Sequence, residues 1–190
     1  NRLSEEFPCL LGVRQDECLS PFLFSLCIND LEDTFIHSGA QGIDVYMFKV
    51  YLLLYADDII IFGTSAEDLQ TNINLLADYC NTWKLKVNIT KTKVIIFKKG
   101  GAIPRNLNFY YDGQELEIVN KITYLGIVFT TGGSLSTAQC TLAGQAQKAI
   151  FTLNKYLYKF SYITPKHKLD LFDKLIAPIL NYGSEVCGFA

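Results

Sequence analysis

Closely spaced cysteines and histidines, which build structural zinc sites, are absent from this sequence. None of its six cysteines forms a Cys-x-x-Cys pair, and neither of the two histidines, His37 and His167, adjoins a cysteine. Zinc sites and disulfide frameworks depend on such spacings, so we expect neither. The cysteines lie mostly among apolar residues and no stretch reads as a signal peptide, so reduced thiols in an intracellular compartment are expected.

Hydrophobic runs long enough to cross a membrane are also absent. The apolar stretch of residues 50–62 is too short for a bilayer and is interrupted by Asp57 and Asp58, so we expect no membrane partner. Repeats and low-complexity segments are absent too, and 49% hydrophobic with 19% charged residues predicts a folded core. The chain begins at Asn1 and ends within an apolar segment, so we expect it to be a piece of a longer polypeptide.

Basic residues are scarce in the first part of the chain. Residues 1–83 contain three (Arg2, Arg14 and Lys49) against thirteen acidic residues, whereas residues 84–190 contain fourteen against six. Within the second part, residues 84–105 carry seven basic residues and no acid. An acidic half followed by a basic half is typical of a metal site combined with a surface that binds polyanions. On charge alone, an ordinary solvated face explains the basic stretch equally well.

Two adjacent carboxylates lie between apolar runs in residues 51–63. Runs rich in Ile, Leu and Tyr indicate buried strands, so the segment predicts a hairpin with a three-residue turn and with Asp57 and Asp58 at its tip. Carboxylates beside a core need a positive partner, and hard oxygen ligands favour Mg²⁺. The alternative is that aspartate serves here only as a good turn residue.

The remaining patterns predict an α+β fold. Ser20 as N-cap and Pro21 begin a helix that reaches about Ser38, and a capping box at residues 64–68 begins another that ends near Asn81 or Trp83. Short strands are predicted at 85–88, 94–97, 109–111, 116–118 and 122–129, with Asp112-Gly113 as a hairpin turn. Helices follow at 136–158 and from Thr164-Pro165 onward, and Pro178 should kink or end the last one. A boundary at residues 130–134 divides a helix-backed antiparallel sheet from a small helical module.

Five segments in one order carry a resemblance to a known family. They are Gly12-Val13-Arg14-Gln15 with Leu19-Ser20-Pro21, Tyr55-Ala56-Asp57-Asp58, Asn88-Ile89-Thr90-Lys91-Thr92, Tyr124-Leu125-Gly126 and Tyr182-Gly183-Ser184-Glu185. In that order and spacing the chain resembles the reverse transcriptase of non-LTR (LINE-type) retrotransposons, from the family's motif B onward and over nearly its whole length. Tyr-x-Asp-Asp alone is a weak signal, whereas five ordered segments are a specific one.

The resemblance implies a right-hand polymerase, with fingers and palm pieces at residues 1–130 and a thumb-like helical region at 131–190. The implied reaction is RNA-directed DNA synthesis from an RNA template, a DNA primer and dNTPs, with Mg²⁺, or Mn²⁺ in its place, as cofactor. In such a reaction two metal ions about 3.5–4 Å apart hold the attacking and leaving oxygens. The rest of the retrotransposon polyprotein is the expected partner in cis, and nucleus and cytoplasm are the expected locations.

The resemblance also assigns roles to single residues. Asp57 is the expected direct metal ligand, with Asp58 assisting, and Lys91 is expected to protonate or neutralise the leaving pyrophosphate. Template and nucleotide contacts are assigned to Arg14, Gln15, Ser20, Tyr55 and Ala56. Primer contacts are assigned to Tyr124, Leu125 and Gly126, where glycine permits close approach of the primer strand. For Arg14, Gln15, Lys91 and the Tyr-Leu-Gly segment, an ordinary exposed loop, lysine or strand is the alternative.

Three departures from the family pattern bear on activity. Asp16, followed by Glu17, occupies the place of the family's usual glycine, and Cys187 stands where the family usually carries Trp. No segment before Leu11 resembles motif A, which supplies a further metal-binding aspartate. The favoured hypothesis is therefore a polymerase fragment that is inactive by itself. The alternatives are a catalytically dead remnant that binds nucleic acid only, and a scaffold without a nucleic-acid role, which fits the composition but not the charge distribution.

Overall fold

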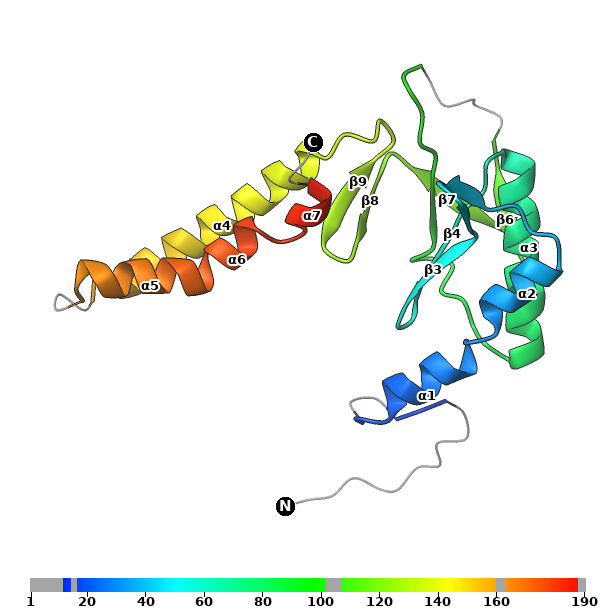
Figure 1. Ribbon diagram of the computed structural model, residues 1–190, viewed down its shortest axis with the longest axis horizontal. Coiled ribbons are helices and arrows are strands. Elements are labelled where there is room, and N and C mark those ends of the chain that lie inside the picture. Colours follow the sequence, from blue (N-terminus) through cyan, green and yellow to red (C-terminus); the bar gives the residue numbers. More distant parts are fainter. Residues whose placement is uncertain (1–11, 15–16, 102–106, 160–162, 188–190) are drawn as a thin grey trace. The chain divides into compact units, whose positions relative to one another are not determined.

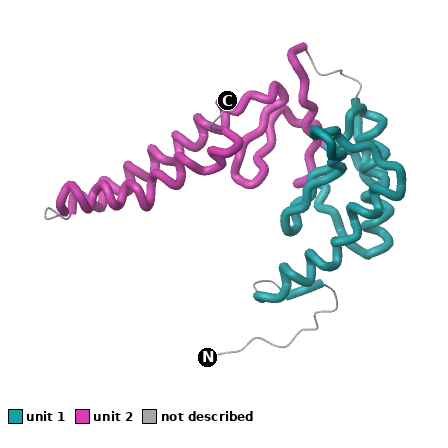
Figure 2. Tube along the Cα trace, in the orientation of Figure 1, with its two compact units in different colours: residues 1–89, 107–116 teal, residues 90–106, 117–190 magenta. Residues whose placement is uncertain are grey.

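The computed structural model describes residues 12–14, 17–101, 107–159 and 163–187 and divides the chain into two compact units (Figures 1 and 2). Unit 1 consists of residues 1–89 and 107–116, and unit 2 consists of residues 90–106 and 117–190. These limits differ from the predicted boundary at residues 130–134. The assignment of 1–130 to fingers and palm and of 131–190 to a thumb therefore stays a prediction.

Unit 1 begins with two helices, where the sequence predicted one. α1 (Ser20–Cys27) and α2 (Leu31–His37) are separated by a turn at residues 28–30. The hydroxyl of Tyr79 lies 3.2 Å from the Cys27 carbonyl oxygen and 2.6 Å from Asp30 Oδ1, and so provides partners for the polar groups at the break. Because this contact comes from a residue far along the chain, the local pattern did not reveal it.

Two hairpins follow in unit 1. β1 (Ile43–Val45) pairs with β2 (Phe48–Val50), and β3 (Leu52–Tyr55) pairs with β4 (Asp58–Ile61), both antiparallel. α3 (Ala66–Trp83) then begins with the predicted capping box, in which Ser65 and Asp68 each bond to the backbone N–H of the other. The core of unit 1 lies between α2, β3 and α3 and contains Leu31, Phe35, Ala40, Leu52, Leu76, Tyr79 and Cys80.

The Asp112-Gly113 turn joins β6 (Phe109–Tyr111) to β7 (Gln114–Val119), as the sequence predicted. Asp112 and Gly113 have φ values of 47° and 74°, the left-handed conformation that a two-residue hairpin turn requires. In unit 1, β6 packs against α3, where the Gln70 side chain bonds to both the N–H and the C=O of Tyr110, at 2.9 and 2.8 Å. The side-chain amide of Gln70 therefore satisfies backbone groups at the edge of β6 that a neighbouring strand would otherwise pair with.

The sheet of unit 2 departs from the prediction in two ways. β5 (Lys93–Ile95) pairs in parallel with Glu117–Val119 of β7, so the pairing is mixed and not purely antiparallel. The single strand predicted at 122–129 is a hairpin, β8 (Lys121–Tyr124) and β9 (Ile127–Thr130), with Leu125 and Gly126 as the turn. In unit 1, residues 85–88 form no strand, although a strand was predicted there.

Four helices complete the described part of unit 2. α4 (Ser136–Leu157) and α5 (Pro165–Leu175) were predicted, and Thr164 accepts a bond from the His167 N–H as the cap of α5. The chain then breaks at Ile176, α6 (Ala177–Leu180) carries Pro178, and α7 (Ser184–Cys187) follows. α4 packs against α6, α7 and β9, with Ile127, Ala138 and Cys187 as a small core.

The fold class predicted from the sequence, α+β, agrees with this mixture of helices and strands. No helix in the described ranges is long and apolar enough to span a bilayer.

Candidate active site

Asp57 and Asp58 lie at the turn of the β3–β4 hairpin. Tyr55 and Asp58 are the last paired residues, so the connection is the two-residue segment Ala56-Asp57, and Asp58 opens β4. The predicted three-residue turn is therefore wrong by one residue. Ala56 has φ +51°, an uncommon value for a residue other than glycine, which costs about 1–2 kcal/mol.

Both carboxylates are exposed, and within the described part of the chain neither side chain has a hydrogen-bond or ion-pair partner. Tyr55, the residue before the turn, is 60% exposed, so the strand leaves the core before it reaches the acids. The tip thus presents two adjacent carboxylates and an aromatic ring to solvent.

The base of the same hairpin is held firmly. Leu52 is buried in the core of unit 1, and Ile59 and Ile61 pack against that core. Asn72 of α3 is fully buried, and its Nδ2 donates to the Phe62 carbonyl and to the Gln41 carbonyl, both at 2.8 Å. A solvent-exposed tip on a base fixed by packing and hydrogen bonds is the arrangement by which a protein holds ligating groups in a preset position.

The donor set at the tip is chemically suited to a hard divalent cation. Aspartate oxygens are the ligands that Mg²⁺ and Mn²⁺ prefer, and Mg²⁺ typically takes one or two carboxylates and completes its shell with water and substrate phosphates. The described residues contain no group of three or more acidic, histidine or cysteine side chains close enough to hold an ion. Asp57 and Asp58 supply two carboxylates, the number of protein carboxylates that Mg²⁺ commonly takes.

Ser20 is the first residue of α1 and Arg14 lies in the segment before it, whereas Gln15 and Asp16 lie outside the described residues. Ser20 is not the N-cap that the sequence predicted. Leu19 occupies that position, and the Ser20 hydroxyl donates to the Arg14 carbonyl instead. The Arg14 guanidinium pairs with Glu17 at 3.3 Å, and both side chains are largely exposed. Glu17, which follows the departure at Asp16, thus pairs with the side chain that the sequence predicted to contact the template.

The other predicted residues lie in unit 2. Lys91 is exposed in the turn that precedes β5, and Tyr124, Leu125 and Gly126 end β8 and form the β8–β9 turn. The structure therefore brings Tyr55, Ala56, Asp57 and Asp58 together on one hairpin, and Tyr124, Leu125 and Gly126 on another.

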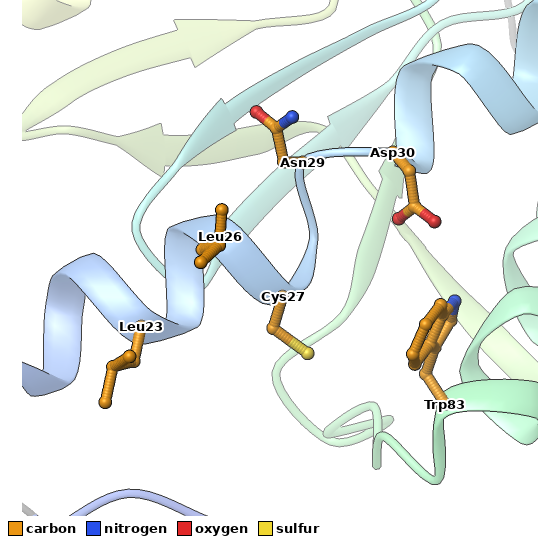
Figure 3. Close-up of a pocket in the computed structure, with 6 residues that line it drawn as sticks. All are labelled: Leu23, Leu26, Cys27, Asn29, Asp30 and Trp83. Atoms are coloured by element: carbon orange, nitrogen blue, oxygen red, sulfur yellow. The ribbon is translucent and has the colours of Figure 1, made fainter.

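A shallow pocket of about 420 Å³ lies beside α1 in unit 1 (Figure 3). Leu23, Leu26 and Cys27 of α1 form one wall, Asn29 and Asp30 follow in the turn, and Trp83 at the end of α3 stands opposite. Burial, followed by the nearby Asp30 carboxylate, raises the pKa of Tyr79, so its phenol stays protonated and bonded to Asp30. Among the described residues, the six that line this pocket include none that the sequence predicted as functional.

Tyr182 is the residue that sequence reasoning missed. Its hydroxyl donates to the Leu125 carbonyl at 2.7 Å, across 57 positions of the chain. The only sequence signal was the Tyr-Gly-Ser-Glu segment itself, which belonged to the resemblance without a role.

An α+β chain with paired carboxylates on a hairpin turn is the general class that these observations define. Residues 1–129 match the family model described as Reverse transcriptase (RNA-dependent DNA polymerase), and the chain belongs to this family. No solved structure matches the chain.

Its relatives are RNA-directed DNA polymerases of non-LTR retrotransposons. The chain is 29% identical over 189 residues to the "Probable RNA-directed DNA polymerase from transposon BS" of Drosophila melanogaster, covering 94% of the chain and 20% of that protein. It is 26% identical over 180 residues to the "Retrovirus-related Pol polyprotein from type-1 retrotransposable element R2" of Popillia japonica, covering 90% of the chain and 24% of the relative. The "RNA-directed DNA polymerase from mobile element jockey" of Drosophila funebris is 23% identical, with 94% and 19% covered. The chain thus spans about a fifth to a quarter of these relatives.

Proposed function

We propose that this chain is the catalytic-hairpin portion of an RNA-directed DNA polymerase of a non-LTR retrotransposon, in which Asp57 and Asp58 hold the metal ions for nucleotidyl transfer. The observation that carries the proposal is the pair of exposed carboxylates, unpartnered among the described residues, on a hairpin whose base is fixed in the core of unit 1. Membership of the reverse transcriptase family supplies the reaction class.

Bound Mg²⁺, or Mn²⁺ in its place, supplies charge stabilisation for the attacking 3′-hydroxyl and for the leaving pyrophosphate. The residues of this chain bind and orient the metal ions, the nucleotide, the template and the primer. Asp57, in the turn, is the direct ligand, and Asp58, the first residue of β4, supports it. Tyr55 and Ala56 border the nucleotide, Arg14 and Gln15 meet the template, and Ser20 fixes the Arg14 backbone. Lys91 neutralises or protonates pyrophosphate, and Tyr124, Leu125 and Gly126 contact the primer.

The direct test is metal binding at the hairpin. Mn²⁺ is paramagnetic and replaces Mg²⁺ at oxygen ligands, so titrating it into the ¹⁵N-labelled chain should broaden the amide signals of residues 55–59 before others. The double substitution Asp57→Asn and Asp58→Asn should remove that broadening.

The matched control is a second pair of adjacent, exposed acids in unit 1, Glu32 and Asp33 on α2. The variant Glu32→Gln with Asp33→Asn carries the same loss of charge and should keep the broadening at residues 55–59. Equal broadening in the wild type and the Asp57/Asp58 variant would show that these two aspartates do not bind the ion.

Polymerisation itself is tested by RNA-templated primer extension with Mg²⁺. We propose that the 190-residue chain alone shows no extension, because Asp57 and Asp58 bind an ion only weakly by themselves and the two-ion arrangement of the reaction needs the further ligand from motif A. A longer polypeptide that includes motif A should extend the primer, and Asp57→Asn in it should abolish extension with little effect on template binding. Extension by the 190-residue chain alone would overturn the fragment hypothesis.

A second candidate is a catalytically dead remnant that binds nucleic acid only. The Arg14–Glu17 ion pair favours it, because Glu17 neutralises the guanidinium that is proposed to meet the template. This candidate predicts that the longer polypeptide binds template and extends no primer. Retained extension would reject it.

A further inference from the structure

The turn between β8 and β9 is covered by an aromatic ring from the C-terminal segment. Tyr182, between α6 and α7, donates its hydroxyl proton to the Leu125 carbonyl at 2.7 Å. A Cβ added to Gly126 would lie only 3.0 Å from Cε1 of the same ring. The hydroxyl and the ring edge therefore meet two successive residues of one turn, and Gly126 is the residue type that leaves room for the ring.

This turn holds its backbone in an unfavourable conformation. Leu125 has φ +46° and Gly126 has φ +78°. The left-handed conformation is natural for glycine, but it costs a residue such as leucine about 1–2 kcal/mol. A strained turn persists only where neighbouring structure holds it, and such turns cluster at functional sites. The Tyr182 hydroxyl, which bonds to the carbonyl of the strained residue itself, is such a restraint.

The segment that carries Tyr182 is itself anchored within unit 2. Gly183 has φ +63°, which favours glycine, and a Cβ there would lie 2.6 Å from Ile127 Cδ1 and displace that side chain, so glycine lets this segment pass close to β9 without such a shift. Next along the chain, Cys187 is buried with Ile127 and Ala138, and its carbonyl accepts a 2.7 Å bond from Gln139 Nε2 of α4. Tyr182 thus reaches the turn from a fixed position.

We propose that Tyr182 is a positioning residue, which holds the Leu125–Gly126 turn in the left-handed conformation that contacts the primer strand. The primer contact rests on the proposed function, whereas the restraint on the turn does not. Without its hydroxyl, the turn relaxes toward conformations that leucine prefers, and Gly126 no longer presents its backbone to the primer in one arrangement.

The test is Tyr182→Phe, which removes the hydroxyl and keeps the ring. We expect the Leu125 and Gly126 amide signals to shift and exchange faster with solvent. The affinity for a fluorescent DNA primer annealed to an RNA template should fall about fivefold, the equivalent of one hydrogen bond. Tyr156→Phe is the matched control, because Tyr156 is an exposed tyrosine of α4 whose hydroxyl has no hydrogen-bond partner among the described residues. It should change neither the signals nor the affinity.

A double-substitution cycle separates positioning from a merely structural role. Glycine adopts the left-handed conformation without penalty, so in a Leu125→Gly background the turn needs no restraint. Adding Tyr182→Phe to that background should lower primer affinity less than about twofold, because strain was the reason for the loss. An equal loss in both backgrounds overturns the positioning role.

The restraint of the turn by Tyr182 and the contact of the turn with the primer are overturned by different results. Unchanged Leu125 and Gly126 signals in Tyr182→Phe overturn the restraint, whatever the affinity shows. Shifted signals with unchanged affinity overturn the primer contact, and the Mn²⁺ experiment on Asp57 and Asp58 is unaffected. If Tyr182→Phe does not fold, Gly126→Ala takes its place, because the new methyl group presses on the Tyr182 ring. Unchanged affinity in that variant overturns the inference, and weakened affinity supports it when the Leu125 amide also exchanges faster with solvent, whereas weakened affinity with unchanged exchange at Leu125 overturns it.

Discussion

A single buried thiol illustrates how the core of unit 1 responds to pH. Cys80 of α3 is 3% exposed and lies among Leu76, Tyr79 and the other core residues. Burial raises the pKa of the Cys80 thiol, and the hydrogen bond from Tyr111 offsets part of that rise. Burial, followed by the same contact with Cys80, raises the pKa of Tyr111. The folded state therefore keeps both protons at pH values where the unfolded chain begins to lose them.

We predict that stability falls at alkaline pH because of Cys80. Its folded-state pKa lies above the unfolded value, so the contribution is complete below about pH 8.5 and is lost as the pH rises through the folded pKa. Between about pH 8.5 and 9.5, the free energy of unfolding should fall more steeply in the wild type than in Cys80→Ala. The difference is at most about 1.4 kcal/mol per pH unit. Urea denaturation under reducing conditions measures both slopes.

The control for this prediction is Cys140→Ala, which removes an exposed thiol on α4. Its slope should equal that of the wild type. Equal slopes in the wild type and Cys80→Ala would show that burial of Cys80 has no effect on the pH dependence.

At the scale of elements, one helix side chain fixes the end of the hairpin that carries the carboxylates. Asn72 of α3 binds the carbonyl oxygens of Phe62 and Gln41, while its own Oδ1 is buried without a partner among the described residues. We predict that Asn72→Ala lowers the free energy of unfolding by about 2–3 kcal/mol, because two part-buried hydrogen bonds to these carbonyls are lost. Urea denaturation gives the value, and hydrogen exchange should show faster opening of β3 and β4.

Asn74→Ala provides the comparison, two residues further along the same helix. Asn74 is exposed, and among the described residues its side chain has one hydrogen bond, which it accepts from Gln70 at 2.8 Å, so its replacement should change stability by about 0.5 kcal/mol or less. A similar loss in both variants would mean that the asparagine contacts to the hairpin do not matter.

Elements with local signals were predictable. The Asp112-Gly113 turn and the Ser65–Asp68 capping box were confirmed because their side chains or backbone preferences act within four residues. The break between α1 and α2 and the Leu125-Gly126 turn were not predicted, because Tyr79 and Tyr182 act on them from 52 and 57 residues away. The parallel pairing of β5 with β7 is also non-local, and periodicity within one strand cannot show it.

The candidate site follows the same division. Asp57 and Asp58 were correctly expected at a hairpin turn, since a short apolar-acid-apolar pattern determines the hairpin locally. The position of the turn was wrong by one residue, because Ala56 rather than a third turn residue adopts the left-handed conformation. The Ser20 cap was wrong because the hydroxyl bonds to the Arg14 carbonyl, and no sequence rule weighs one such partner against another.

At the scale of the whole molecule, charge follows the division into units more closely than it follows the halves of the sequence. Unit 1 contains five basic and fifteen acidic residues, a net charge of −10. Unit 2 contains twelve basic and four acidic residues, a net charge of +8. A protein with this distribution attracts polyanions to one unit and cations to the other.

We predict that nucleic-acid affinity rests on lysines of unit 2 and depends steeply on salt. The triple variant Lys155→Gln, Lys168→Gln and Lys174→Gln neutralises exposed lysines of α4 and α5. If all three meet phosphates, the slope of log affinity against log salt should become shallower by about 2–3. Fluorescence anisotropy with a labelled primer–template across a salt series measures this slope.

A matched variant in unit 1 separates specific contacts from net charge. The triple variant Lys49→Gln, Lys84→Gln and Lys86→Gln also removes three positive charges, but from exposed positions in the acidic unit 1. Its slope should remain close to that of the wild type. An equal change in both triple variants would assign the salt dependence to total charge.

The order in which the chain is made also matters for unit 1. Its second stretch, residues 107–116, brings β6 to α3, where Gln70 binds the Tyr110 backbone and Phe109 becomes buried. Ribosomes add about 5–20 residues per second, so synthesis of residues 90–116 takes about one to five seconds after the first stretch is complete. During that interval the face of α3 that receives β6 has no strand to cover it. Because this face is uncovered, nascent chains in this state are the ones that chaperones would bind or that would associate with one another prematurely.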